Sequence, residues 1–112
     1  MKNNYIPERG DIVWLNFDPQ AGKEIKKRRP ALILTPREYN RYKYAIVCPM
    51  TGNATKRPFK IDFINDAGIE SAIIIEQIKS IDWRERQAEF KEKAPHDVVE
   101  NAIDMIGMLL TQ

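Results

Sequence analysis

The sequence predicts a small, mostly antiparallel β-barrel closed by one helix at its C-terminal end. Two observations carry this prediction: short runs rich in β-branched and aromatic residues recur between polar loops, and the last segment changes to helical spacing. The chain has 112 residues, no Gly/Ser- or Pro-rich linker and no internal repeat, so residues 1–112 are expected to form one domain. A helix-dominated fold is disfavoured because the β-branched runs are too many.

The first half supplies three expected strands. Residues 11–17, DIVWLNF, alternate two sets of apolar side chains, as a strand does. Residues 30–36, PALILTP, form an apolar run closed by a proline at each end, and residues 44–50, YAIVCPM, form another buried run. Between them, PREYNRYK is expected to make one or two helical turns, since Pro36 suits a first helical position.

The second half supplies further strands and the closing helix. Residues 58–63, PFKIDF, alternate as a half-exposed strand does, and residues 71–83, SAIIIEQIKSIDW, hold one long or two short strands. In residues 95–112 apolar side chains recur at helical spacing, and Pro95 and Asp97 lie at the start, where a proline and an acid are favourable. One amphipathic C-terminal helix is therefore predicted.

The net charge of +2 conceals a strong asymmetry between the halves of the chain. Residues 1–60 contain 13 Lys/Arg and 5 Asp/Glu, a charge of +8, whereas residues 61–112 contain 5 and 11, a charge of −6. A basic half of this size attracts polyanions through its field and through counterion release. The alternative, that the two halves neutralise each other across the fold, stays open on charge alone.

Several kinds of chemistry find no support in the residues. A single cysteine, Cys48, cannot form an intramolecular disulfide or a thiolate zinc cluster, and its place in an apolar run indicates a buried, inert thiol. The only histidine, His96, is expected on the surface at the helix start. No cluster has metal-ligand spacing and no glycine-rich loop matches a phosphate cradle, so neither a metal nor a cofactor is expected.

The location follows from what the chain lacks. The apolar runs YAIVC and AIII are too short to cross a bilayer, and the N-terminal MKNNYIPERGD has no apolar stretch like that of a signal peptide. The default expectation is a cytoplasmic protein that does not engage a membrane.

The segment GKEIKKRRP, residues 22–30, carries the most chemical information. Five basic side chains surround one acid in this loop: Lys23, Lys26, Lys27, Arg28 and Arg29. The basic residues alone indicate phosphate binding, which would gain nothing from the acid, Glu24. Among five cations Glu24 is expected to stay ionised, which makes it a usable proton acceptor. Arg29 precedes the expected strand, so its guanidinium is well placed to clamp a phosphate with two hydrogen bonds.

A base beside a phosphate clamp is what RNA strand scission requires. The base removes the 2′-hydroxyl proton, the oxygen attacks the adjacent phosphorus, and the cation stabilises the dianionic phosphorane. DNA lacks that hydroxyl and cannot react by this route. A solvated basic turn without catalytic function remains the alternative on the residues of the loop alone.

Three stretches together resemble the MazF/PemK (Kid) family of toxin endoribonucleases, and within it MazF itself. They are GDIVWLNFDPQAGKEIKKRRPALILTP, CPMTGN and EQIKSIDW. The resemblance implies an SH3-like barrel of the MazF/Kid/CcdB type with a C-terminal helix. It implies a homodimer, with the active groove at or near the subunit interface, that cleaves single-stranded RNA at a short sequence without a metal. The products would carry a 2′,3′-cyclic phosphate and a 5′-hydroxyl.

The resemblance also implies partners. A cognate MazE-like antitoxin would neutralise the toxin by inserting an acidic tail into the basic groove. The toxin–antitoxin complex would bind its operator DNA chiefly through the antitoxin, so the toxin would contact that DNA only indirectly.

The family's catalytic pattern maps onto three positions: Glu24 as the base, Arg29 as the phosphate clamp and Thr51 as the group that positions the scissile phosphate. Ten further residues are expected to contact RNA: Lys23, Lys26, Lys27, Arg28, Asn53, Lys56, Arg57, Glu76, Gln77 and Lys79. The Kid branch uses a histidine, an arginine and an aspartate at positions that hold Lys23, Ile74 and Glu76 in this chain. The Kid version of the mechanism therefore cannot be transferred whole.

Two other functions compete with this interpretation. The CcdB gyrase poisons share the barrel and act through an exposed tryptophan near the end of the C-terminal helix, whereas here no tryptophan follows Trp83. The other alternative is a barrel that binds RNA without cleaving it. That alternative predicts that Glu24 is dispensable for binding or weakens it.

Overall fold

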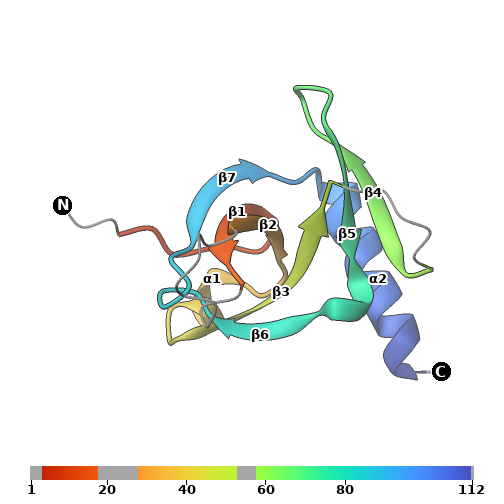
Figure 1. The fold of residues 1–112 in the computed structure, drawn as a ribbon. Helices are drawn as coiled ribbons and strands as arrows, with labels where there is room; N and C mark the ends of the chain where they lie inside the picture. The colour runs from red at the N-terminus through yellow and green to blue at the C-terminus, as the bar shows by residue number, and fades with distance from the viewer. Residues whose placement is uncertain (1–3, 18–27, 53–57, 112) are drawn as a thin grey trace.

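The computed structural model is a curled antiparallel sheet, open on one side like a half-barrel, with a long helix packed beside it (Figure 1). The structure describes residues 4–17, 28–52 and 58–111. Its strands are β1 (Asp11–Asn16), β2 (Arg28–Ile33), β3 (Tyr44–Thr51), β4 (Lys60–Ile64), β5 (Glu70–Ile74), β6 (Lys79–Asp82) and β7 (Glu89–Lys93). Its helices are α1 (Arg37–Asn40) and α2 (His96–Thr111), and a 3₁₀ turn spans Ile75–Gln77.

The sheet runs in the order β4-β5-β3-β2-β1-β7, and β6 also pairs with β3. Every pairing is antiparallel, which confirms the predicted class of sheet. The predicted C-terminal helix is also present, and it begins directly after Pro95. Among the described residues no helix is both long and apolar enough to span a membrane.

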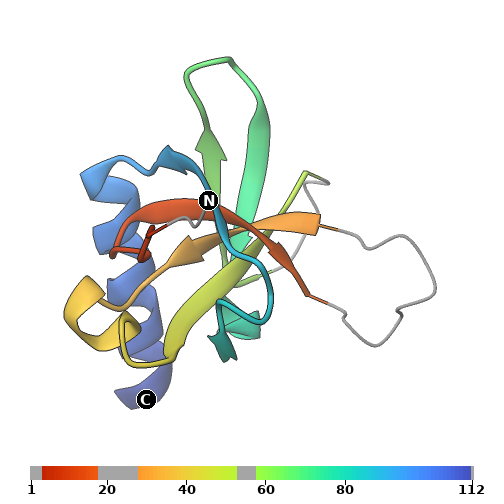
Figure 2. The same ribbon diagram turned by 90° about the vertical axis from the view of Figure 1, so that its left-hand side faces the viewer.

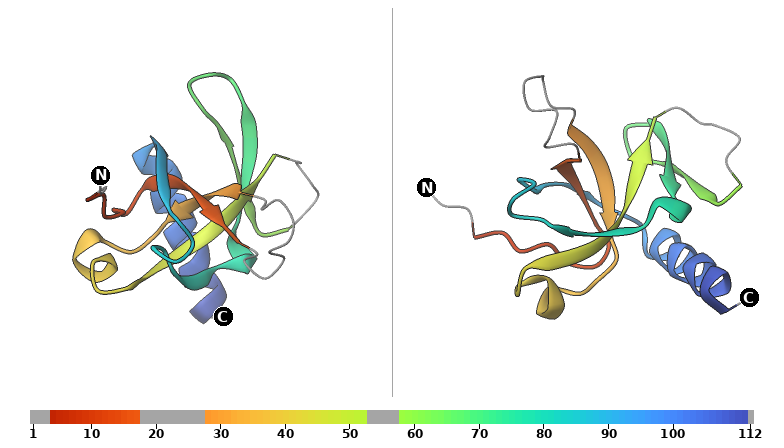
Figure 3. Two further views of the ribbon diagram at one scale, coloured as in Figure 1. Left: turned by 60° about the vertical axis from the view of Figure 1, so that its left-hand side comes forward. Right: turned by 60° about the horizontal axis from the view of Figure 1, so that its bottom comes forward.

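Strand β3 is the central strand of the sheet, and on one edge it changes its pairing partner along its length (Figure 3). From Tyr44 to Val47 it pairs with β6, whereas Met50 and Thr51 pair with β5. The chain must therefore turn between β5 and β6, and the 3₁₀ turn Ile75–Gln77 makes that turn. The segment 71–83 is thus two short strands rather than one long strand.

Two apolar clusters lie on opposite faces of β1 and β2. The cluster under α2 contains Ile12, Leu32, Leu34, Cys48, Met50, Phe63, Ile73, Ile75, Ala94, Val99 and Ala102. The second cluster fills the inside of the curl and contains Val13, Leu15, Ala31, Ile33, Ala45, Val47, Ile81 and Trp83. Because both faces of these strands are buried, β1 and β2 read as nearly continuous apolar runs in the sequence.

Two strand assignments differ from the sequence-based expectation. Strand β2 begins at Arg28, two residues before Pro30, because Arg28 and Arg29 pair with the end of β1. Strand β7 was not expected at all. Its sequence, EFKEK, is mostly charged because it lies at the edge of the sheet, where charged side chains also discourage pairing with other chains.

Gly10 and Asp11, at the start of β1, connect this strand to the ends of β2 and β7. Gly10 has a φ of 96°, a conformation that favours glycine, and its backbone bonds Ile33 and Ala94. The carboxylate of Asp11 is buried and accepts hydrogen bonds from the Tyr5 hydroxyl and from Lys93 Nζ. Burial of the Tyr5 side chain raises its pKa, and the hydrogen bond to Asp11 raises this pKa further. Gly10 and Asp11, which open the first stretch that resembles the toxin family, therefore have a structural role.

Candidate active site

The candidate site lies at the end of the sheet where β1 and β3 end and β2 begins (Figure 2). The pairing of β1 with β2 reaches Asn16 opposite Arg28, and Thr51 is the last residue of β3. Seven predicted site residues lie outside the described part of the chain: Lys23, Glu24, Lys26, Lys27, Asn53, Lys56 and Arg57. Their predicted roles stay predictions, and the described residues define the frame on which their loops are carried.

Arg29 and Thr51 come from neighbouring strands at this end. Strands β2 and β3 pair from Ile33 opposite Val47 to Ala31 opposite Pro49, and Arg29 and Thr51 each lie two residues beyond that last pair. Side chains alternate along a strand, so Arg29 shares its face with Ala31, and Thr51 shares its face with Pro49. Both therefore project on the side of the second apolar cluster, at its open end. The structure therefore places the two residues on neighbouring strands, and their predicted catalytic roles stay predictions.

The two neighbouring arginines of β2 have different surroundings. Arg28 is half-buried, and its guanidinium donates to Asn16 Oδ1 at 3.0 Å, to the Gln87 carbonyl at 2.8 Å and to Glu89 Oε1 at 3.3 Å. Arg29 is exposed, and within residues 4–17, 28–52 and 58–111 its side chain has no hydrogen bond or ion pair. Arg28 therefore holds the start of β2 in place, whereas Arg29 has no such role among the described residues.

Lys79 adds a second cation on the same side of the sheet. It pairs with Val47 at the start of β6, and its Nζ lies 5.4 Å from the centre of the Phe17 ring. Phe17 is the last described residue before the first loop, so Lys79 lies at the base of that loop. Glu76 and Gln77 are exposed on the adjacent 3₁₀ turn. Lys79 thus lies across β3 from β2, and the RNA contacts predicted for Glu76, Gln77 and Lys79 stay predictions.

The opposite face of the same strands has an apolar cavity of about 380 Å³. Trp14, Pro30 and Met50 line it on one side, and the β4–β5 hairpin lines it on the other through Ile69. Lys91 Nζ lies 5.5 Å from the centre of the Trp14 ring. Sequence reasoning treated Trp14 only as an aromatic residue of a strand, because the cavity forms only where residues of five separate strands meet.

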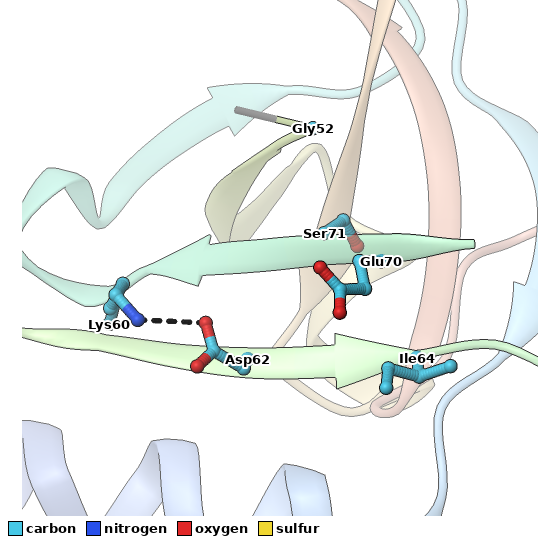
Figure 4. Close-up of a pocket in the computed structure, with 6 residues that line it drawn as sticks. All are labelled: Gly52, Lys60, Asp62, Ile64, Glu70 and Ser71. Carbon is cyan, nitrogen blue, oxygen red and sulfur yellow. Dashed lines mark hydrogen bonds and ion pairs between the residues drawn. The ribbon is translucent and has the colours of Figure 1, made fainter. Parts of the chain in front are cut away.

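A second cavity, of about 240 Å³, lies beside Gly52, the residue after Thr51 (Figure 4). Lys60 Nζ and Asp62 Oδ1 pair along one side of it, on the same face of β4, at 2.8 Å. Glu70 and Ser71 of β5 complete its lining. The alternation of PFKIDF does place Lys60 and Asp62 on one exposed face, but nothing in the sequence shows that β5 brings Glu70 beside them.

The two residues excluded as catalytic groups behave as expected. Cys48 is fully buried, and burial raises the pKa of its thiol to about 12, so it stays a protonated, inert thiol. His96 is on the surface at the first position of α2, with its Nε2 3.1 Å from Glu100 Oε2. Neither residue lines the candidate site.

The fold and this site define a class of protein: a small antiparallel half-barrel that offers arginine and lysine side chains at one end of its sheet, as nucleic-acid-binding modules do. Comparison with known proteins makes the assignment specific. The chain belongs to the PemK-like, MazF-like toxins of type II toxin–antitoxin systems, whose family model matches residues 8–109.

Individual relatives agree with this assignment. The chain is 35% identical over 89 residues to the endoribonuclease toxin MazF of Escherichia coli K12, covering 79% of each protein. It is 29% identical over 109 residues to the Escherichia coli endoribonuclease PemK, covering 93% of this chain and 82% of that protein. The fold matches the crystal structure of MazF from Deinococcus radiodurans with a TM-score of 0.85 at 39% identity, covering 97% of this chain and all of that one. A MazE–MazF complex from the same organism matches with a TM-score of 0.82 at 35% identity, covering 96% and 97%.

Proposed function

We propose that this toxin is an endoribonuclease that cuts single-stranded RNA at a short sequence, without a metal, through attack by the 2′-hydroxyl. The proposal is supported by relatives that are named endoribonucleases and by the exposed Arg29 at the start of β2, next to the strand that ends at Thr51. An exposed guanidinium that has no partner among the described residues is suited to receive a phosphate.

Each of the three residues has a defined task in this reaction. Glu24 takes the proton from the 2′-hydroxyl, and the freed oxygen attacks phosphorus. Arg29 binds the non-bridging oxygens and stabilises the phosphorane, in which negative charge has built up. Thr51 positions the same phosphate through its hydroxyl. The bond to the 5′-oxygen then breaks, that oxygen takes up a proton, and the products are a 2′,3′-cyclic phosphate and a 5′-hydroxyl.

Partners complete the proposal. A MazE-like antitoxin would occupy the cationic end of the sheet with an acidic segment, which the similarity to MazE–MazF complexes supports. We further propose a homodimer with the active groove at or near the subunit interface, which exposed apolar residues such as Ile64 and Ile69 of the β4–β5 hairpin would help to form. Operator DNA would be bound only through the antitoxin. The toxin would act in the cytoplasm, where its RNA substrate is.

The decisive experiment is digestion of a long, defined single-stranded RNA in excess EDTA, with both ends of every fragment mapped. Discrete cuts with cyclic-phosphate and 5′-hydroxyl ends are expected. The matched control is the same RNA with a 2′-deoxynucleotide at the cut position, which should remain whole. Tight, salt-sensitive binding without cleavage would replace the proposal with a non-catalytic RNA-binding barrel. If the protein neither binds nor cleaves the RNA, the gyrase-poison alternative is the one that remains.

A further inference from the structure

The end of β3 opposite Thr51 has a surface that the proposed reaction does not use. We call it the tyrosine patch, and it consists of Tyr39, Arg41, Tyr42, Lys43, Tyr44 and Arg84. Three of the four tyrosines of the chain lie in it. Their exposed fractions are 45% for Tyr39, 78% for Tyr42 and 45% for Tyr44. Single exposed apolar side chains are ordinary, whereas several exposed tyrosines in one short segment of a small domain indicate a binding surface.

Cations lie against the rings of this patch. Arg41 Cζ is 5.5 Å from the centre of the Tyr42 ring, and Lys43 Nζ is 5.6 Å from that of Tyr44. Arg84 Cζ is 4.3 Å from the centre of the neighbouring Trp83 ring. Alternating aromatic and cationic groups are what proteins use to hold single-stranded nucleic acid, since the rings stack on bases while the cations follow the phosphates.

A buried anchor holds the patch in position. Asn40, in the middle of the tyrosine segment, is fully buried, and its Nδ2 donates to the carbonyl oxygens of Pro7 and Thr35 at 2.8 Å each. Trp83 Nε1 in turn donates to the Asn40 carbonyl at 2.7 Å. The backbone beneath the exposed rings is therefore ordered before any ligand arrives, which reduces the entropy lost on binding.

The charges around the patch indicate which form of RNA it suits. Three acids, Glu38, Asp82 and Glu85, lie next to its cations in the sequence. The Asp82 carboxylate is used within the fold, where it accepts the backbone N–H groups of Arg84 and Glu85 at 3.2 Å. Because these three acids balance the patch's three cations, its net charge is small, and stacking rather than charge must supply most of the affinity. Stacking needs unpaired bases, so a single strand fits the patch and a duplex does not.

We propose that the tyrosine patch is a second binding site for single-stranded RNA, on which bases remote from the cut stack. This inference rests on the proposed endoribonuclease function. Tyr44 and Thr51 are the two ends of one eight-residue strand, which places them about 23 Å apart at about 3.3 Å per residue. An RNA that reaches both must run along the outside of the sheet. The patch therefore favours long substrates over short ones that span only the cut.

The test compares two RNAs with the same cut site, one short and one with a long single-stranded flank. Tyr42→Ala should raise KM for the long RNA about fivefold or more, because base–aromatic stacking contributes about 1–3 kcal/mol per base. The value of kcat and all constants for the short RNA should be unchanged. Tyr42→Trp should restore wild-type KM, since it keeps an aromatic face. Leu110→Ala is the matched control, because Leu110 is equally exposed, at 79%, but lies on α2.

Three outcomes would overturn the inference. An equal rise in KM for both RNAs would mean that Tyr42→Ala acts at the cut site or through the fold. An unchanged KM for both RNAs would mean that the patch does not bind RNA. Weaker antitoxin binding without any change in RNA kinetics would assign the patch to a protein partner. If the wild type cuts neither RNA, the proposed function fails, and the patch is then judged by binding of the long RNA: equal affinities of wild type and Tyr42→Ala would overturn it.

Discussion

The two ends of β3 are built in different ways. At the Tyr44 end, the exposed tyrosines lie in a segment that is anchored by the fully buried Asn40. The side-chain amide of Asn40 donates to two backbone carbonyl oxygens. At the Thr51 end, Arg29 is exposed on a strand whose pairing with β3 stops at Ala31. The anchor of the Tyr44 end is thus satisfied within the fold, whereas Arg29 has no partner among the described residues. In the two proposals above, the Tyr44 end would only bind RNA and the Thr51 end would cleave it.

The largest expected effect belongs to the Thr51 end. Glu24→Gln should lower the cleavage rate by about 10²–10⁴-fold, the usual contribution of a general base, because the amide cannot accept the 2′-hydroxyl proton. RNA binding should be equal or tighter, since one negative charge is lost. Single-turnover cleavage and a filter-binding titration measure the two quantities. Cleavage at the wild-type rate would end the assignment of Glu24 as the base.

The neighbouring arginines of β2 provide a matched pair of substitutions. Arg29→Ala should slow cleavage by about 10²–10³-fold, the effect of losing one donor to a developing oxyanion, and should leave Tm unchanged because its side chain is exposed. Arg28→Ala should instead lower Tm, since Asn16, Gln87 and Glu89 lose their common donor. Steady-state kinetics and thermal unfolding separate the two variants. A reversed pattern would show that Arg28, not Arg29, holds the phosphate.

A substitution at the Tyr44 end should affect stability rather than chemistry. Asn40→Ala leaves the carbonyl oxygens of Pro7 and Thr35 without their donor, which should lower the free energy of unfolding by about 1–3 kcal/mol. The value of kcat on a short RNA should remain that of the wild type. Denaturant unfolding gives the first quantity. An unchanged free energy of unfolding would mean that the patch is not held by this anchor.

At neutral pH the smallest expected effect lies between the two ends, at Cys48. Because burial raises the pKa of this thiol to about 12 from the ordinary value of 9.0, the unfolded chain ionises it first. Its stabilising contribution is fully present below pH 9 and is lost as the pH rises from 9 towards 12. Unfolding free energies across this range should therefore fall more steeply for the wild type than for Cys48→Ala. Parallel curves would show that the thiol is not buried in solution.

The sequence alone predicted much of the fold, but how well a strand was recognised depended on how far its side chains are buried. Strands with both faces buried, such as β1 and β3, were recognised because their apolar residues are continuous. The edge strand β7 was missed because EFKEK has the composition of a loop, and only its pairing with β1 makes it a strand. The helix α2 was recognised because its apolar spacing repeats over several turns.

The amino-acid sequence by itself determined the class of fold and the inert state of Cys48, and it singled out Glu24 and Arg29, because residue type and local spacing are properties of neighbours along the chain. The choice of Thr51 came from the family resemblance. The tertiary structure decided which residues become neighbours in space: the pairing of β2 with β3 makes the strands of Arg29 and Thr51 neighbours, and the length of β3 separates the tyrosine patch from Thr51. These relations depend on contacts between strands distant in sequence, which no local pattern encodes.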